Sequence, residues 1–259
     1  MKYRVGSVPY LNAKPLVRMF EDLGASSPVS VVYDVPSRLP ALLEADEVHA
    51  ILVSSIEALR HPDLHFADGV SICSQREVFS VRLFSKVPFG EIRRLALDAS
   101  SMTSNALAQI LLDQRFGVRP ATTTLAPDLD RMLAECDGGI LIGDNGMRAT
   151  GEGLHVLDLG LEWNTWTGLP FVWALWVGHD EVLGDLGEHL RTAREYGEGH
   201  LPDIARQGSK ETGLLVELCE HYLTDIMSYS LGPRERAGLD RFREELLRLG
   251  LLETPKALA

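Results

Sequence analysis

The segment Leu95–Leu112, LALDASSMTSNALAQILL, decides the fold. Its apolar run Leu95–Leu97 predicts a buried strand that ends at Asp98, and from Thr103 to Arg115 apolar residues recur at helical spacing. A strand followed at once by a helix is the repeating unit of α/β proteins with a parallel sheet. The segment therefore predicts the α/β fold class.

The junction between this strand and helix also predicts an anion site. The first N–H groups of a helix are unpaired and lie at the positive end of its dipole, where a carboxylate binds without any lysine or arginine. Serine and threonine are the preferred helix caps, so a single hydroxyl would indicate capping alone. The junction holds more hydroxyls than a cap requires, and we expect ligand contacts from Ser100, Ser101, Thr103 and Ser104.

The alternation of strands and helices extends to both sides of this segment. Further predicted strands are Tyr3–Ser7, Ser30–Tyr33, His49–Val53, Thr122–Leu125, Gly139–Ile142 and Phe171–Val177. Further predicted helices are Pro15–Leu23, Ser37–Glu44, Ser54–Leu59 and Asp128–Glu135, followed by a helical tail with Asp180–Tyr196, Lys210–Asp225 and Pro233–Leu249.

Two short crossings bracket the middle of the chain, near Phe84–Pro88 and Phe171–Gly178. We therefore predict a discontinuous lobe 1, residues 1–88 and 178–259, and an inserted lobe 2, residues 89–177. A cleft between two such lobes is the default ligand site.

Composition narrows the class of partner. The 259 residues contain 25 Lys and Arg against 37 Asp and Glu, a formal charge of -12 with no basic stripe, so we expect no nucleic-acid partner. Cys73, Cys136 and Cys219 are widely spaced and predict buried, reduced thiols. We find no apolar signal-peptide core and no run long enough to span a membrane, and expect a cytoplasmic protein without a membrane partner.

Polar residues follow two further predicted strands. Asp144 and Asn145 come directly after Ile142, and Asn12 follows the first strand; ligands of open α/β sheets gather at such strand ends. Helix capping is an equal interpretation for Asp144 and would also explain Asn12. Nearby, we expect Trp173 and Trp176 in the core, and Trp163 and Trp166 as possible walls of a pocket.

Familiar signatures for nucleotide, metal and serine-hydrolase chemistry are absent from the sequence. In contrast, five segments together resemble the menaquinone biosynthetic enzymes of the futalosine route, and within them the chorismate dehydratase branch. They are VPYLNAKPL (Val8–Leu16), SVRLFSKVP (Ser80–Pro88), LDASSMTSNALAQILL (Leu97–Leu112), ILIGDNGM (Ile140–Met147) and DLGLEWNTWTGLPFVWALW (Asp158–Trp176).

This resemblance implies a two-lobed fold like that of type II periplasmic binding proteins, used as an enzyme without metal or organic cofactor. The implied reaction, a hydro-lyase step of menaquinone biosynthesis, eliminates water from the dicarboxylate chorismate. By the same resemblance Asn12 and Ser80 contact a substrate carboxylate, and the opposite lobe holds an anionic end with Ser101, Thr103 and Ser104. Asn145 and Trp166 complete the expected substrate contacts.

The proton acceptor stays open at this point. Asp144 is the one acid that we nominate, and the alternative is the enolpyruvyl carboxylate of the substrate itself. Three other functions are also considered: the sister enzyme that acts on a cyclic futalosine derivative, a non-catalytic binding protein for a small carboxylate, and a ligand-sensing regulatory domain. The segment VPYLNAKPL argues against the first of these.

Overall fold

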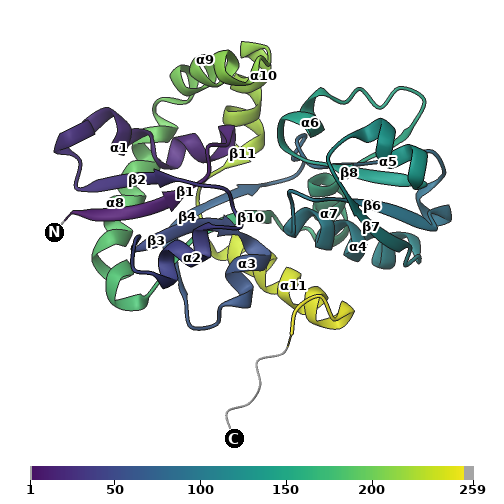
Figure 1. Ribbon diagram of the computed structural model, residues 1–259, viewed down its shortest axis with the longest axis horizontal. Coiled ribbons are helices and arrows are strands. Elements are labelled where there is room, and N and C mark those ends of the chain that lie inside the picture. Colours follow the sequence, from purple (N-terminus) through teal and green to yellow (C-terminus); the bar gives the residue numbers. More distant parts are fainter. Residues whose placement is uncertain (1, 254–259) are drawn as a thin grey trace, which may run out of the picture. The chain divides into compact units, whose positions relative to one another are not determined.

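The computed structural model describes residues 2–253, which form two compact units. The first unit contains the chain up to Cys73 together with Val172–Arg236, and the second contains Ser74–Phe171 together with the described residues from Ala237 onward. Each unit has its own β-sheet (Figure 1).

The sheet of the first unit has six strands in the order β11-β4-β10-β3-β1-β2. Strand β1 pairs in parallel with β2 and β3, and β10 runs antiparallel to β3. The inner strand β3, AILVS, is apolar over its first four residues and all four are buried, as expected for a strand that is covered on both faces. The bounds of the strands are β1 (Tyr3–Ser7), β2 (Val29–Tyr33), β3 (Ala50–Ser54), β4 (His65–Ser74), β10 (Phe171–Gly178) and β11 (Met227–Ser228).

Helices and helical turns cover this first sheet. Helix α8 packs against α1, and α9 and α10 lie side by side (Figure 1). The bounds are η1 (Leu11–Leu16), α1 (Arg18–Leu23), η2 (Gly24–Ser26), α2 (Leu39–Glu44), α3 (Ser55–Arg60), α8 (Asp180–Glu198), α9 (Leu201–Thr212), α10 (Val216–His221) and the π-helical turn η4 (Tyr222–Ile226). No helix among residues 2–253 combines the length and the apolar character needed to cross a membrane.

Two predicted helices of the first unit are wrong in their limits. In place of one helix over Pro15–Leu23, the 3-10 turn η1 precedes α1 and the two are separated at Val17. Glycines at the contacts of η1 explain this: a Cβ on Gly197 would lie 1.9 Å from the Pro15 carbonyl oxygen, and one on Gly208 would lie 2.3 Å from Leu11. Helices α8 and α9 therefore press directly on this turn and fix its backbone.

The predicted helix Lys210–Asp225 is also wrong, because α9 already ends at Thr212. Gly213 caps it with φ 72, the left-handed conformation that favours glycine, and its N–H donates to the carbonyl of Ser209. The chain then starts again as α10 and η4.

The second unit has a five-stranded sheet in the order β7-β6-β8-β5-β9. Strand β6 runs parallel to β7 and β8, whereas β5 runs antiparallel to β8 and β9. The bounds are β5 (Arg82–Ser85), η3 (Phe89–Glu91), β6 (Arg94–Asp98), α4 (Thr103–Phe116), β7 (Ala121–Leu125), α5 (Leu129–Glu135), β8 (Gly138–Leu141), α6 (Gly143–Arg148), β9 (His155–Asp158), α7 (Leu159–Thr167) and α11 (Pro233–Leu249). The α/β fold class and the predicted junction of β6 with α4 are confirmed.

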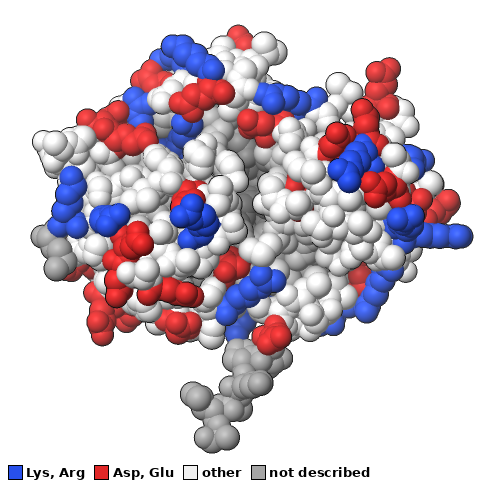
Figure 2. All heavy atoms as spheres, viewed as in Figure 1, with Lys and Arg blue, Asp and Glu red and all other residues white. Residues whose placement is uncertain are grey.

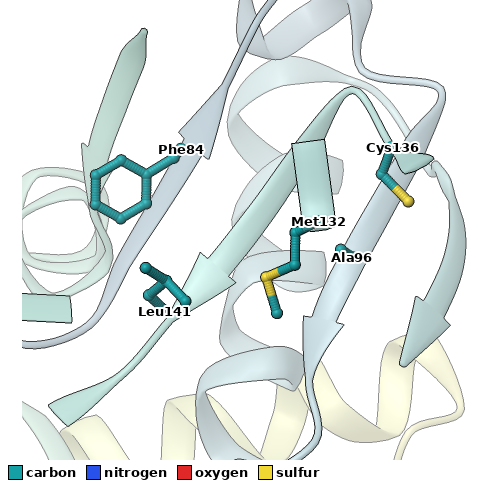
Figure 3. Close-up of a cluster of buried hydrophobic side chains, with 5 residues drawn as sticks. All are labelled: Phe84, Ala96, Met132, Cys136 and Leu141. Atoms are coloured by element: carbon teal, nitrogen blue, oxygen red, sulfur yellow. The ribbon is translucent and has the colours of Figure 1, made fainter. Parts of the chain in front are cut away.

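One side of this second sheet carries a compact apolar cluster. It is built from side chains of β5, β6, α5 with the residue after it, and β8 that are at most 3% exposed, namely Phe84, Ala96, Met132, Cys136 and Leu141 (Figure 3). A Cβ on Gly139 would lie 2.8 Å from the Cβ of Met132, so glycine at this strand position lets α5 approach β8. All three cysteines are buried and none of them forms a disulfide, as predicted.

The limits of the two units differ from those predicted for the lobes. Strand β5 pairs with β8 and β9, which places the segment from Ser74 to residue 88 in the second unit. The last helix, α11, also contributes to that unit: the Phe242 ring lies 4.9 Å from the Phe171 ring and 6.3 Å from the Trp163 ring. Strand alternation and helical periodicity predict these elements but do not identify the sheet on which they pack.

Charged side chains of both signs alternate on the surface. On the face that Figure 2 shows, Lys and Arg side chains are scattered among Asp and Glu side chains. Several of them form ion pairs along one helix, for example Arg18 with Asp22 and Arg131 with Glu135. Such exposed pairs contribute about 0–1 kcal/mol each.

Candidate functional site

Four chain segments leave the second sheet at the same edge. Strands β6 and β8 are parallel and end at Asp98 and Leu141, and the antiparallel β5 begins at Arg82, opposite Leu141. Strand β9 ends at Asp158, opposite Arg82. This edge therefore gathers most of the predicted site residues, which are Ser80, Ser100, Ser101, Thr103, Ser104, Asp144 and Asn145.

The first segment, from Asp98 to Asn105, is held by its own side chains. One carboxylate oxygen of Asp98 accepts from the Ser100 amide at 2.8 Å and from the Ser100 hydroxyl at 2.5 Å. Asn105 accepts from the Asp98 amide at 3.0 Å and donates to the Asp98 carbonyl at 2.8 Å. The loop thus has a fixed shape before any ligand binds.

The hydroxyls of this segment differ in their surroundings. The N-cap of α4 is Met102, and the Ser101 hydroxyl before it accepts from the Ser104 amide at 3.3 Å, so it satisfies one of the first N–H groups of the helix. The Ser100 side chain is exposed and engaged with Asp98, while Thr103 and Ser104 are 3% and 4% exposed. Sequence reasoning missed Asp98 and Asn105, although an aspartate at a strand end and an asparagine in the following helix are the local signals for such a loop.

The second segment contains Ser80. The pattern of apolar and polar residues over Val78–Phe84 is typical of a strand, but β5 begins only at Arg82. Ser80 instead follows a tight turn in which its amide donates to the Val78 carbonyl at 2.6 Å and Phe79 has φ 58. A bulky residue in this conformation is an outlier that other groups must hold in place.

Asp158 supplies much of that support. Its carboxylate accepts from the Val78 amide at 3.0 Å and from the Phe79 amide at 2.6 Å, and it also caps α7 by accepting from Leu161 at 2.9 Å. Burial raises the pKa of this carboxyl above its ordinary value, and the backbone N–H donors oppose that rise. No local sequence pattern predicts this contact, because the partners are 79 and 80 positions apart.

The third segment is the short helix α6, which carries Asp144 and Asn145. Gly143 has φ 56, and the residue before the helix, Ile142, makes no side-chain cap. Asp144 is half-buried within the first turn, so the predicted helix-cap role of Asp144 is wrong. Asn145 is exposed and its amide lies 3.5 Å from the Pro127 carbonyl oxygen.

Helix α6 is packed tightly on the Ser80 turn. A Cβ on Gly146 would lie 2.2 Å from the Ser80 carbonyl oxygen. The guanidinium of Arg82 donates to the carbonyls of Gly146 and Ala149, at 2.7 Å for Ala149, and stacks over the Phe79 ring at 5.1 Å. Arg82 therefore links the turn, the start of β5 and the last carbonyls of α6.

Asn12 belongs to the first unit and lies within η1. It is half-buried, and its side-chain amide donates to the Tyr222 hydroxyl at 3.4 Å rather than capping a helix. Tyr222 is 2% exposed and opens the π-helical turn η4. Such turns are frequent at functional sites. The Tyr222 contact thus orients the Asn12 amide.

The structure places one more tryptophan in the core than the sequence predicted. Trp173 and Trp176 are 8% and 0% exposed and lie in the core as predicted. Trp163 is also 0% exposed, and its indole N–H donates to the Pro170 carbonyl at 3.2 Å, so it is a core residue and not a pocket wall.

Trp166 is half-buried and lines a shallow pocket with Thr167, Leu169 and Arg241, whose guanidinium lies 5.2 Å from the indole centroid. It lies near the C-terminal end of α7, about 10 Å along the helix axis from the Asp158 end that meets the strand edge. Trp166 is therefore separate from the residues gathered at that edge.

Comparisons with known proteins agree on one family. Residues 3–247 match the family model described as menaquinone biosynthesis. A curated chorismate dehydratase from Thermus thermophilus is 33% identical over 265 residues, covering 94% of this chain and 95% of the relative. A curated chorismate dehydratase from Campylobacter jejuni is 24% identical over 248 residues, covering 92% and 94%.

Solved structures show the same fold at low identity. The protein AF1704 from Archaeoglobus fulgidus superposes with a TM-score of 0.74 at 17% identity, covering 96% of this chain and 98% of that one. The alkanesulfonate-binding protein SsuA from Xanthomonas axonopodis superposes with a TM-score of 0.71 at 14% identity, covering 97% and 94%. The fold is thus that of the periplasmic binding proteins, and by its sequence the chain belongs to the menaquinone biosynthesis family.

Proposed function

We propose that the chain is a hydro-lyase of the cytoplasm that converts chorismate to 3-[(1-carboxyvinyl)oxy]benzoate. The observation that carries this proposal is its 33% identity to a chorismate dehydratase over 94% of the chain. The match extends over 95% of that relative, so the whole enzyme and not a single shared module supports the assignment.

The reaction requires the loss of the C3 proton and the C4 hydroxyl, after which the ring becomes aromatic. The ring carboxylate is conjugated through a double bond to C3, so donors that neutralise this carboxylate also stabilise the charge that develops as the proton leaves. A site for this substrate therefore needs hydrogen-bond donors toward carboxylate groups.

The second unit offers such donors at the strand edge. We assign the Ser80 hydroxyl to a substrate carboxylate, and the start of α4 with Ser101, Thr103 and Ser104 to an anionic end of the substrate. The amide of Asn12, oriented by the Tyr222 hydroxyl at 3.4 Å, is the corresponding donor from the first unit. The preformed loop around Asp98 supports this proposal, since a fixed set of dipoles does not have to reorganise during the reaction.

The proton acceptor is proposed as Asp144, the one acid nominated in the α6 segment, and the enolpyruvyl carboxylate of chorismate is the alternative. Asn145 on the same helix and Trp166 complete the proposed contacts. Trp166 lies beside Arg241, at the far end of α7 from the strand edge.

The direct test is to incubate the purified chain with chorismate and to follow the product by mass spectrometry. We expect a product that has lost one water and has the absorption of a substituted benzoate. Chorismate that binds in calorimetry but stays unchanged would contradict the enzyme assignment and favour a non-catalytic carboxylate-binding protein.

Variants sharpen this test. Ser80→Ala and Asn12→Ala are expected to lower kcat/KM by about tenfold or more, because each removes a donor to the charge that develops. Thr150→Ala, which removes an exposed hydroxyl in the second unit, is the control and should retain wild-type turnover.

A further inference from the structure

The turn before β5 contains Phe79, the one non-glycine residue with positive φ in the described part of the second unit. The Ser80 amide donates to the Val78 carbonyl across a single residue, Phe79, whose φ of 58 closes a γ-turn of the rare positive-φ kind. A phenylalanine does not hold this conformation unless its surroundings impose it. The direction of the Ser80 side chain therefore depends on what holds the turn.

One carboxylate binds the amides of the first two residues of this turn. The two oxygens of Asp158 lie 3.0 and 3.2 Å from the Val78 amide nitrogen, and one of them lies 2.6 Å from the Phe79 amide nitrogen. A carboxylate accepts several N–H donors at once, whereas an asparagine side chain offers one acceptor oxygen and an NH₂ group that cannot accept. The contact is therefore specific for an acid.

The same residue anchors the turn to the sheet. Asp158 is the last residue of β9, pairs with Arg82 of β5, and caps α7. Close packing reinforces the anchor: a Cβ on Gly160 would lie 2.8 Å from the Arg76 carbonyl oxygen, and one on Gly146 would lie 2.2 Å from the Ser80 carbonyl oxygen. The turn is thus confined between α7 and α6, and Asp158 accepts hydrogen bonds from its Val78 and Phe79 N–H groups.

We propose that Asp158 is a positioning residue for Ser80: its carboxylate holds the Val78–Phe79–Ser80 turn so that the Ser80 hydroxyl meets a substrate carboxylate. This inference rests on the proposed function, because it assigns a partner to a residue of that site. Asp158 itself touches no substrate in this scheme and acts through the backbone of the turn.

The test is a double-mutant cycle of Asp158→Asn and Ser80→Ala, read on chorismate turnover. We expect Asp158→Asn to lower kcat/KM by about tenfold or more in the wild-type background, in line with the cost of misplacing a reacting group. In the Ser80→Ala background the same change should cost less than about twofold, since the hydroxyl that it positions is already gone. Equal losses in both backgrounds would overturn the proposal.

A matched control separates positioning from helix capping. Asp128 also caps a helix of the second unit, accepting from the Arg131 amide at 3.1 Å. Asp128→Asn makes the same chemical change at the start of α5 and should leave kcat/KM within about twofold of wild type. A tenfold loss in this control would attribute the Asp158 effect to capping and contradict the proposal.

A rescue experiment addresses the backbone directly. Glycine adopts positive φ without the steric cost of a side chain, so Phe79→Gly in the Asp158→Asn chain should recover part of the lost turnover. Substitution of Phe79 alone should cost less than Asp158→Asn. Absence of any recovery would show that the turn conformation is not what Asp158 maintains.

Amide hydrogen exchange gives a readout that does not need the substrate. The amides of residues 78 and 79 should exchange faster in Asp158→Asn than in wild type, whereas the amides of α5 should be unchanged. If wild type leaves chorismate intact, the proposed function fails and the exchange result still decides whether Asp158 holds the turn. Unchanged exchange would overturn the inference on its own.

Discussion

Asp144 is the side chain that we propose as acceptor of the C3 proton. Replacement by asparagine keeps the size of the side chain and removes its ability to accept a proton, so Asp144→Asn should lower kcat by about a hundredfold or more if Asp144 is the base. Single-turnover kinetics with chorismate measure this step. Asp130, an acid in the first turn of α5, provides the matched control, and Asp130→Asn should turn over normally. Near-normal turnover of Asp144→Asn would assign the proton to the carboxylate of the substrate.

Individual side chains show how far sequence reasoning reaches. The position of the hydroxyl side chains at the junction of β6 and α4 was predictable, because the strand, the loop and the helix follow one another within one segment. The role of Asp158 was not, since it lies 79 positions from Phe79 and its contact exists only after β5 and β9 pair. Trp163 was misjudged for a similar reason: its burial against Phe171, with ring centroids 5.3 Å apart, follows from how α7 packs.

At the scale of the element, substitution by alanine should change the free energy of unfolding in opposite directions at two glycines of helix α8. A Cβ on Gly197 would lie 1.9 Å from the Pro15 carbonyl oxygen, whereas a Cβ on Gly184 would meet no atom within 4 Å. Gly184→Ala should therefore raise the free energy of unfolding by about 0.5–1 kcal/mol through helix propensity. Gly197→Ala should lower it by about 1–3 kcal/mol through overpacking. Chemical denaturation of both variants decides, and equal shifts would contradict the packing of η1 on α8.

Element limits were predicted well where local signals and packing agree. Helix α4 matches its predicted range to within one residue, because an apolar helical face and a terminal Gly117 with φ 71 both indicate it. The predicted helix Lys210–Asp225 failed because Gly213 was not taken as a stop signal, although it ends α9 in the left-handed conformation. Strand β4 lacks a clear two-residue alternation and was missed altogether.

At the scale of the whole chain, each unit holds an aspartate that ties distant elements together. Asp22 on α1 binds Arg18 of the same helix and accepts a hydrogen bond from Tyr196 of α8. Asp113 on α4 binds Arg119, which follows that helix, and Arg248 of α11. The arginine hydrogen bonds lower the pKa of both carboxyls below the ordinary value. Periodicity identified α11 as a helix, but such contacts and the ring of Phe242 decide where it packs.

These lowered pKa values set the direction of the pH dependence. A carboxyl whose pKa is depressed in the folded state contributes stability above its unfolded pKa, and this contribution is lost as the pH falls through the folded pKa. The free energy of unfolding should therefore decline as the pH falls from about 5 toward 2, and Asp113→Asn should decline less steeply because one such group is gone. Urea titrations at several pH values measure the slope, with Asp130→Asn as a control for the change in net charge. A slope for Asp113→Asn equal to that of wild type would show that ionisation of Asp113 does not contribute to the pH dependence of the free energy of unfolding.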